Sequence, residues 1–186
     1  VIMKKRSRIL SAIIAFAILP GLAQADAAGG FHWTSSPPLI VPPKSDDITY
    51  YGVKDPSVVF YDGEYHVFMT TAGSNGWGLA YTRFSDWSQA KTSTIVPLDK
   101  SPMGPGYRAA PQVFFFAPQK LWYMVYQGGD PMYSTSPDIA DPLSWSVPRP
   151  FFETVPDMVK QPDGNPAWLD FWVICDDAKC YLFFTN

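Results

Sequence analysis

Two aspartates stand at matching places in apolar, aromatic-rich segments of the chain. Asp55 opens the run Asp55–Tyr61, and Asp170 lies inside the run Trp168–Ile174. An aspartate before Pro56 can simply begin a turn, but that reading does not account for the second aspartate. A carboxylate inside an apolar segment is costly to bury without a partner or a purpose. Paired carboxylates at one focus are what hydrolysis of a glycosidic bond requires, one as base or nucleophile and one as acid.

The elements that position these aspartates repeat along the chain. The first unit predicts strands at 55–61, 64–70 and 78–84, with the hairpin turn Asp62-Gly63 between the first two. The second predicts strands at 110–116, 121–126 and 132–136, and the third at 169–175 and 180–185. The units start at residues 55, 110 and 170.

This spacing predicts the fold class. A period near 50 residues, with about four strands a unit, is typical of β-propeller blades. The alternative is a β-sandwich with irregular hairpins. In a propeller the first strand of each blade lines the central channel, so Asp55 and Asp170 would point into one axial pocket. The sequence therefore predicts an all-β chain carrying about three blades, which do not close a ring.

Aromatic residues add one candidate contact for a sugar. Trp77 lies in the glycine-rich turn Gly73–Gly78, and its ring could stack on a pyranose. Most of the other tryptophans are expected in the cores of the blades. His32 and His66 are not spaced as a metal-binding pair, so no metal site is predicted.

Three separated segments give a resemblance to a known family. They are 54–59 (Lys-Asp-Pro-Ser-Val-Val), 110–118 (Ala-Pro-Gln-Val-Phe-Phe-Phe-Ala-Pro) and 168–176 (Trp-Leu-Asp-Phe-Trp-Val-Ile-Cys-Asp). In this order they resemble glycoside hydrolase family 62, the α-L-arabinofuranosidases that act on arabinoxylan. The resemblance covers residues 31–186. It implies a five-bladed propeller, similar to that of family 43, and an inverting mechanism.

The resemblance also implies roles for individual residues. Asp55 matches the general base that activates water, and Asp170 matches the carboxylate that raises the pKa of the acid and orients it. Lys54 and Gln112 would bind hydroxyl groups of arabinose. The structural alternatives are a solvated lysine and a polar strand residue bonded to a neighbouring blade. No cofactor is required, although members of the family can hold a structural calcium ion.

The general acid of the family, a glutamate, has no match in this sequence. Glu64 follows a hairpin turn and is expected in solvent, and Glu153 lies in a proline-rich connection. We therefore expect the acid beyond Asn186, in a parent enzyme of which this chain is an N-terminal part that is inactive by itself. A family 43-type glycosidase and a non-catalytic carbohydrate-binding propeller remain alternatives.

The N-terminus predicts export. A basic cluster after Met3, an apolar run over 9–22 and Ala23-Gln24-Ala25 are typical of a cleaved signal peptide at 1–25, which leaves a domain at 26–186. Val1 and Ile2 are expected to precede the true start. A membrane anchor is disfavoured because the apolar run is short and contains Pro20 and Gly21.

The net charge limits the classes of partner that the domain could bind. The formal net charge is −3, and removing the four positive charges of residues 1–25 makes it −7. Such an acidic domain is a poor partner for nucleic acid or an anionic membrane. We expect a secreted monomer whose partner is a polysaccharide, arabinoxylan.

Cys175 and Cys180 flank a hairpin-like turn, and an oxidising compartment would allow a disulfide there; two buried thiols are the alternative.

Overall fold

The computed structural model describes residues 33–185 of the 186-residue chain, so the predicted leader at 1–25 lies outside the described residues. Within 33–185 every strand pairing is antiparallel and there is no α-helix, which confirms the all-β prediction. In this part of the chain no helix is long and apolar enough to cross a membrane.

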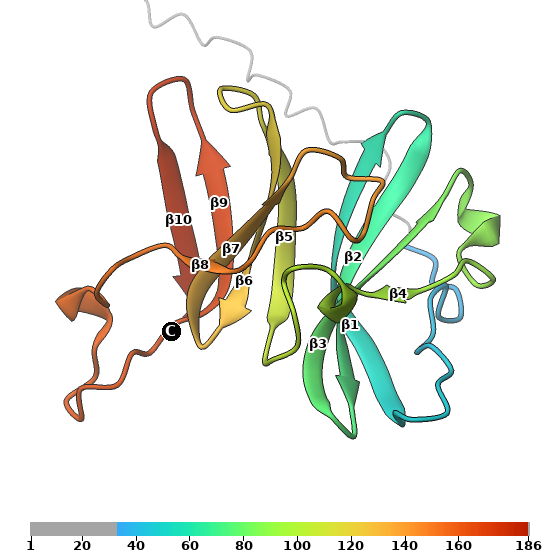
Figure 1. Cartoon of the computed structure of the whole chain (residues 1–186), viewed down its shortest axis with the longest axis horizontal. Coiled ribbons are helices and arrows are strands. Elements are labelled where there is room, and N and C mark those ends of the chain that lie inside the picture. The colour runs from blue at the N-terminus through green and yellow to red at the C-terminus, as the bar shows by residue number, and fades with distance from the viewer. Residues whose placement is uncertain (1–32, 186) are drawn as a thin grey trace, which may run out of the picture. The chain divides into compact units, whose positions relative to one another are not determined.

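The strands form three sheets that follow the three units of the sequence (Figure 1). The first sheet has the order β1 (Tyr50–Tyr61), β2 (Glu64–Gly73), β3 (Gly76–Phe84) and β4 (Val96–Pro97). The second has β5 (Ala109–Phe116), β6 (Leu121–Gly128), β7 (Asp130–Ser136) and β8 (Arg149–Pro150). The third has β9 (Leu169–Cys175) and β10 (Cys180–Thr185). Three short 3₁₀ helices lie at Trp87–Gln89, Leu98–Lys100 and Asp157–Val159.

Turn chemistry fixes the hairpins. Asp62 and Gly63 connect β1 to β2 with φ angles of 48° and 78°. A two-residue turn of type I′ needs positive φ at both positions, and Asp-Gly is among the pairs that adopt it most readily. This turn sets the register that pairs Tyr61 with Glu64, so the predicted hairpin is confirmed.

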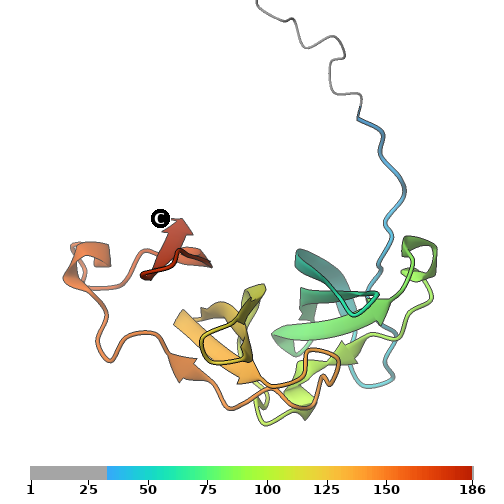
Figure 2. The ribbon, with the colours of Figure 1, turned by 90° about the horizontal axis from the view of Figure 1, so that it is seen from above.

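The first strands of the sheets lie side by side. Strand β5 contacts β1 and β2, and β9 contacts β5 and β6, so the sheets follow one another in chain order (Figure 2). Phe68 of the first sheet packs edge-to-face on Trp145, in one core with Trp122 and Met124 of the second. Val125 and Val173 belong to a second core, between the second and third sheets. Burying each large apolar side chain contributes about 1.5–3 kcal/mol, so these cores hold the sheets together.

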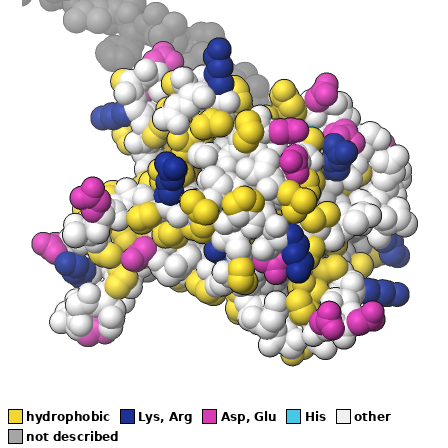
Figure 3. All heavy atoms as spheres, in the orientation of Figure 1, with side chains coloured by type: hydrophobic (Ala, Val, Ile, Leu, Met, Phe, Trp, Pro, Cys, Tyr) yellow, Lys and Arg dark blue, Asp and Glu magenta, His cyan; other side chains and the backbone are white. Residues whose placement is uncertain are grey.

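The third sheet differs from the other two in how much of it is covered. Among residues 33–185 it has two strands, and several large apolar side chains on them are exposed: Leu169, Trp172, Ile174, Tyr181, Phe183 and Phe184. Figure 3 shows hydrophobic side chains dispersed over the visible face, with acidic groups scattered among them.

The strands β4 and β8 that close the first two sheets have two residues each, and no pattern in the sequence located them. The expectation that most tryptophans other than Trp77 are core holds for three of them and not for two. Trp122, Trp145 and Trp168 are buried, whereas Trp87 and Trp172 are 37% and 52% exposed. Trp77, the stacking candidate, is 41% exposed. Trp172 is exposed because the face of the third sheet that carries it is uncovered.

Candidate functional site

One backbone feature recurs in all three sheets. Asp55, Ala110 and Asp170 have φ angles of 51°, 51° and 53°, the left-handed region that residues other than glycine seldom adopt. In each sheet the register of the first strand shifts at this point: between Lys54 and Ser57, between Ala109 and Gln112, and between Leu169 and Trp172. Bulges of this kind redirect a side chain and are common beside active sites. The three residues thus occupy equivalent positions in their sheets.

The Asp55 carboxylate is held by a buried threonine. Thr70 of β2 is fully buried, and its hydroxyl donates to Asp55 Oδ2 at 2.8 Å. The same oxygen, Thr70 Oγ1, accepts the backbone N–H of Ala110 at 2.8 Å. Because that amide can only donate, the hydroxyl proton of Thr70 is directed at Asp55. The side chain of Asp55 remains 32% exposed, open to a water or a substrate.

Lys54 connects this carboxylate to Trp77. Its ammonium nitrogen lies 3.4 Å from Asp55 Oδ2 and 4.2 Å from the centroid of the Trp77 ring. The lysine side chain is 50% exposed, so the ion pair adds little to stability and instead places a positive charge beside the carboxylate. Three predicted site residues therefore form one group, named here the Asp55 cluster: Lys54, Asp55 and Trp77.

Asp170 lies outside the Asp55 cluster. Its Oδ2 accepts from the Thr185 hydroxyl at 3.3 Å, and within the described residues no hydrogen bond or ion pair joins it to Lys54 or Asp55. Asp170 is exposed on the uncovered third sheet, so its predicted role stays a prediction. The arrangement nevertheless repeats that of Asp55, because in both cases the threonine stands 15 residues after the aspartate on the second strand of its sheet.

Gln112 uses both ends of its amide within the fold. Its Nε2 donates to the Val173 carbonyl at 2.9 Å, and its Oε1 accepts the Val173 N–H at 2.5 Å. Ser57, at the equivalent place in β1, accepts the N–H of Val113 at 2.9 Å. The position two residues after the left-handed residue therefore links one sheet to the next. This favours the structural alternative for Gln112, and its contact with a sugar stays a prediction.

Sequence reasoning missed Thr70. Threonine in a strand is ordinary, and nothing local marks this one. The repeated spacing from Asp55 to Thr70 and from Asp170 to Thr185 is the signal that could have identified it.

The remaining candidates are a metal site and the cysteines. Among residues 33–185 no three His, Cys, Asp or Glu side chains lie close enough to one another to hold a metal ion. Cys175 and Cys180 form a disulfide across the β9–β10 turn, with Cα atoms 4.0 Å apart.

The contacts of the buried His66 indicate a structural role. Its Nδ1 lies 2.8 Å from the Tyr81 hydroxyl and its Nε2 lies 3.3 Å from the Tyr61 carbonyl. Burial lowers the pKa of His66, and it raises the pKa of Tyr81. This pair is part of the first sheet rather than of the Asp55 cluster.

The Asp55 cluster can hold a carboxylate ready to accept a proton. The threonine donates a hydrogen bond to one oxygen, the lysine ammonium lies 3.4 Å from that same oxygen, and the partly exposed side chain leaves room for a water. A base positioned in this way typically contributes a factor of about 10²–10⁴ to a reaction rate.

Comparison with known proteins identifies the family. The model of glycosyl hydrolase family 62 matches residues 32–186. An α-L-arabinofuranosidase C of Cellvibrio japonicus is 37% identical over 155 residues, which are 83% of this chain and 22% of that protein. The catalytic domain of a family 62 α-L-arabinofuranosidase from Coprinopsis cinerea is 51% identical, with a TM-score of 0.77 over 83% of this chain and 48% of that one.

A further solved structure is similar over much the same part of the chain. It is an α-L-arabinofuranosidase of Podospora anserina in complex with cellotriose, 48% identical, with a TM-score of 0.74 over 80% of this chain and 46% of that one. The chain thus spans about half the length of these solved structures. Because the family model matches every residue that the structure describes, the chain belongs to glycosyl hydrolase family 62.

Proposed function

We propose that this chain is the N-terminal part of the catalytic domain of a secreted, inverting α-L-arabinofuranosidase that removes arabinofuranosyl side chains from arabinoxylan. The observation that carries the proposal is the Asp55 cluster: a partly exposed carboxylate held by Thr70 and paired with Lys54. The activities of the similar proteins support it, as does a solved family 62 hydrolase in complex with xylotriose, 44% identical with a TM-score of 0.73.

In the proposed mechanism Asp55 is the general base. Its carboxylate takes a proton from a water, which attacks the anomeric carbon from the face opposite the departing xylan oxygen. Inversion leaves room for that water, so base and acid stand roughly 6.5–9.5 Å apart. Asp170 orients the acid and raises its pKa by like-charge proximity. Lys54 binds a hydroxyl group of the arabinose.

The proposal assigns the general acid to no residue of this chain. Glu64 forms an ion pair with Arg83 at 3.1 Å, next to the Asp62-Gly63 turn, and Glu153 is exposed in the connection after β8. Neither glutamate contacts the Asp55 cluster. We therefore propose that the complete enzyme is a five-bladed propeller whose remaining part supplies the acid and any structural calcium site, and that this chain alone does not release arabinose.

The position of the glutamates also favours a second candidate. A carbohydrate-binding propeller without turnover would keep the Asp55 cluster and would need no general acid. The two candidates separate on the complete protein, because only the enzyme releases arabinose from wheat arabinoxylan.

The test of the base uses Asp55→Asn in the complete enzyme. The amide keeps the size of the side chain but cannot take a proton, so turnover should fall by at least about a hundredfold. Added azide, a nucleophile that needs no base, should restore turnover and give a β-arabinosyl azide.

The matched control is Asp62→Asn. Asp62 also has positive φ, at 48°, and lies in the turn after β1, so this variant should keep full turnover. Near-normal turnover in Asp55→Asn, or an arabinosyl group trapped covalently on a carboxylate, would refute the assignment of Asp55 as the base of an inverting enzyme.

A further inference from the structure

The chain around Asp170 is tied to the second sheet on both sides of this left-handed residue. After it, the N–H and the carbonyl of Val173 bond to the two ends of the Gln112 side chain. Before it, the indole Nε1 of Trp168 donates to Asp130 Oδ1 at 3.2 Å. Asp170 thus lies between two links that join the third sheet to the second.

The side chain of Asp170 is held less firmly than that of Asp55. Asp170 accepts from the hydroxyl of Thr185 at 3.3 Å, and both residues are exposed. Asp55 accepts from the fully buried Thr70 at 2.8 Å. The place of the Asp170 carboxylate therefore depends on where the two links hold its backbone.

Trp168 anchors the chain where it enters β9. Its side chain is 4% exposed, in the core between the second and third sheets. The ring stacks on Phe152 with centroids 5.8 Å apart and meets Phe171 and Phe184 edge-on at 5.5 and 5.7 Å. These three rings fix the direction of the indole N–H. A buried indole N–H usually has an acceptor, and here Asp130 supplies it.

A glycine turn places Asp130 beside this indole. Asp130 is the first residue of β7 and pairs with Gly128 across the β6–β7 hairpin. Gly129, between them, has a φ angle of 93°, which other residues rarely adopt. A Cβ atom at Gly128 would lie 2.7 Å from Met132 Cγ, so that position also requires glycine. The tight turn holds the Asp130 carboxylate at the end of the second sheet.

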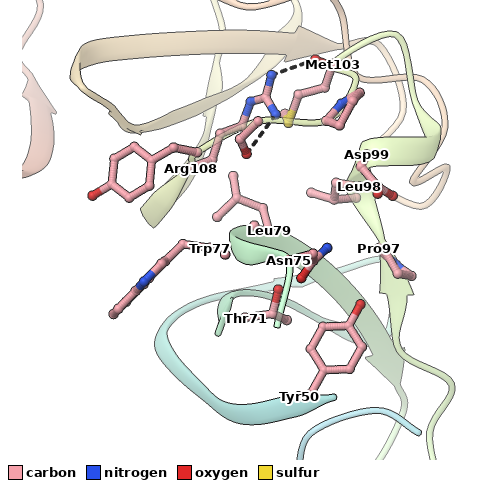
Figure 4. A pocket seen from close by; sticks show the side chains of 15 residues that line it. Tyr50, Thr71, Asn75, Trp77, Leu79, Pro97, Leu98, Asp99, Met103 and Arg108 are labelled. Carbon is pink, nitrogen blue, oxygen red and sulfur yellow. Dashed lines mark hydrogen bonds between the residues drawn. The ribbon is translucent and has the colours of Figure 1, made fainter. Parts of the chain in front are cut away.

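An equivalent link joins the first sheet to the second. Arg108 stands two residues before Ala110, as Trp168 stands two before Asp170. The backbone N–H of Arg108 donates to the Trp77 carbonyl at 3.3 Å, at the start of β3, the strand that corresponds to β7. Figure 4 shows Arg108 and Trp77, with the guanidinium bonded to carbonyls of the loop before β5. In both places the third strand of one sheet holds the entry of the next.

The two links differ in the atoms that make them. The link before Ala110 uses backbone atoms, whereas the link before Asp170 uses two side chains. The position that carries a carboxylate is therefore the one whose link depends on residue type, and substitution can remove this link without altering the backbone.

We propose that Trp168 and Asp130 are positioning residues for Asp170, because their hydrogen bond fixes the entry of β9 and thereby the distance from the Asp170 carboxylate to the general acid. The proposal rests on the proposed function, in which Asp170 raises the pKa of that acid. The interaction of two like charges depends on their separation, so a small displacement of β9 would change the pKa of the acid.

The test compares Asp130→Leu, which removes the acceptor, with Asp130→Asn, which keeps an oxygen there, in the complete enzyme. In Asp130→Leu kcat should fall roughly tenfold or more, as a small misplacement causes, with KM nearly unchanged. The alkaline limb of the pH profile of kcat, where the general acid loses its proton, should move to lower pH by roughly half a unit, the scale for like charges that separate by about 1 Å. The acidic limb, which reports the base, should not move. Asp130→Asn should behave like the original enzyme.

Trp168→Phe removes the donor and should displace the alkaline limb in the same direction, which provides a second measurement if Asp130→Leu does not fold. The matched control is Trp87→Phe, since Trp87 also packs against two aromatic rings, those of Tyr65 and Phe84, but lies in η1 after the first sheet. It should leave both limbs in place. An unmoved alkaline limb in the Asp130→Leu and Trp168→Phe enzymes would overturn the proposal, as would an equal displacement in Trp87→Phe.

A double variant separates the proposal from the proposed function. If the pair acts through Asp170, Asp130→Leu should move the alkaline limb no further once Asp170→Asn has removed the charge. A displaced limb in Asp170→Asn with an unmoved one in Asp130→Leu would overturn only the positioning role. An unmoved limb in Asp170→Asn would instead refute the part that the proposed function gives to Asp170.

The geometry can be measured in this chain without any activity. Asp130→Leu should change the NMR amide chemical shifts of Asp170 and Thr185, and Asp130→Asn should leave them nearly as they are. Shifts at these two amides that do not respond to Asp130→Leu would overturn the positioning role, whatever the complete enzyme does.

Discussion

At the scale of single residues, the candidate site is built on a backbone conformation that few side chains adopt. Strained residues persist only where their surroundings determine them, and at Asp55 the surroundings are Thr70 and, through it, the N–H of Ala110. The threonine is a positioning residue, because it reaches the reaction only through the carboxylate that it holds. The hydrogen bond that it accepts from the Ala110 N–H also joins the first sheet to the second.

Thr70→Val tests this arrangement. Valine keeps the shape but leaves the Ala110 N–H and Asp55 Oδ2 without their partner. The free energy of unfolding should fall by about 1–3 kcal/mol, measured by urea denaturation. Thr70→Ser, which keeps the hydroxyl, should recover most of the loss. In the complete enzyme Thr70→Val should also shift the pH profile of kcat, and an unshifted profile would reduce Thr70 to a purely structural role.

His66 makes a prediction about acid stability. Because burial lowers its pKa in the folded chain, the unfolded chain takes up a proton first as the pH falls below about 6.5. Stability should therefore be constant above that pH and decline below it, by at most about 1.4 kcal/mol for each pH unit. Thermal melts between about pH 7 and 5 measure the slope.

His66→Gln should remove this decline and keep a second one. Hydrogen bonds from Ser88 lower the pKa of Asp86, and backbone bonds from Ala178 and Lys179 lower that of Asp176. Their contribution is present above about pH 4 and is lost below it, in both proteins. Equal slopes between about pH 6.5 and 5 would show that His66 does not titrate as expected.

At the scale of elements, the strands could be predicted and the links between sheets could not. Alternating apolar residues and the Asp62-Gly63 turn located β1 to β3, because both signals are local in sequence. The links depend on residues far apart: Ser57 with Val113, and Gln112 with Val173. The placement of Lys54 between Asp55 and Trp77 also depends on the three-dimensional fold, because Trp77 is distant in the sequence. The exposure of Asp170 depends on what covers its sheet, which its own strand does not encode.

Gln112→Leu separates the two interpretations of that residue. Loss of both bonds to Val173 leaves a buried edge of β9 unsatisfied, so the free energy of unfolding should fall by about 1–3 kcal/mol. Binding of arabinose, measured by calorimetry in the complete enzyme at a temperature where the variant is folded, should be unchanged if the amide is purely structural. Ser57→Ala, which removes one such bond, should lose less stability. Weakened arabinose binding with unchanged stability would restore the sugar-contact prediction.

At the scale of the whole molecule, the third sheet has only two strands among the described residues, so a long strand stands at its outer edge. Strand β10 pairs only with β9 among residues 33–185, and it carries Tyr181, Phe183 and Phe184 partly in solvent. Exposed apolar edge strands are the usual starting points for association between chains. This contrasts with the monomer expected from the sequence, which remains a prediction.

Self-association of the isolated chain is therefore expected. Phe183→Lys places a charge on the open strand and should shift the chain toward monomer in light scattering after size-exclusion chromatography. Leu143→Lys is the control, since Leu143 is 52% exposed but lies in the loop after β7. A chain that is monomeric at high concentration, with or without Phe183→Lys, would contradict this expectation.

The equivalence of Asp55, Ala110 and Asp170 has a consequence for engineering. The first strand of every sheet has the same left-handed position, and the side chain at that position alone decides what chemistry it can carry. Asparagine and aspartate accept left-handed φ more readily than alanine does, so Ala110 has no conformational advantage at its position. Ala110→Asp would install a third inner-strand carboxylate on an unchanged scaffold. Because the left-handed position recurs in every sheet, the second sheet offers a place for a carboxylate where this chain has an alanine.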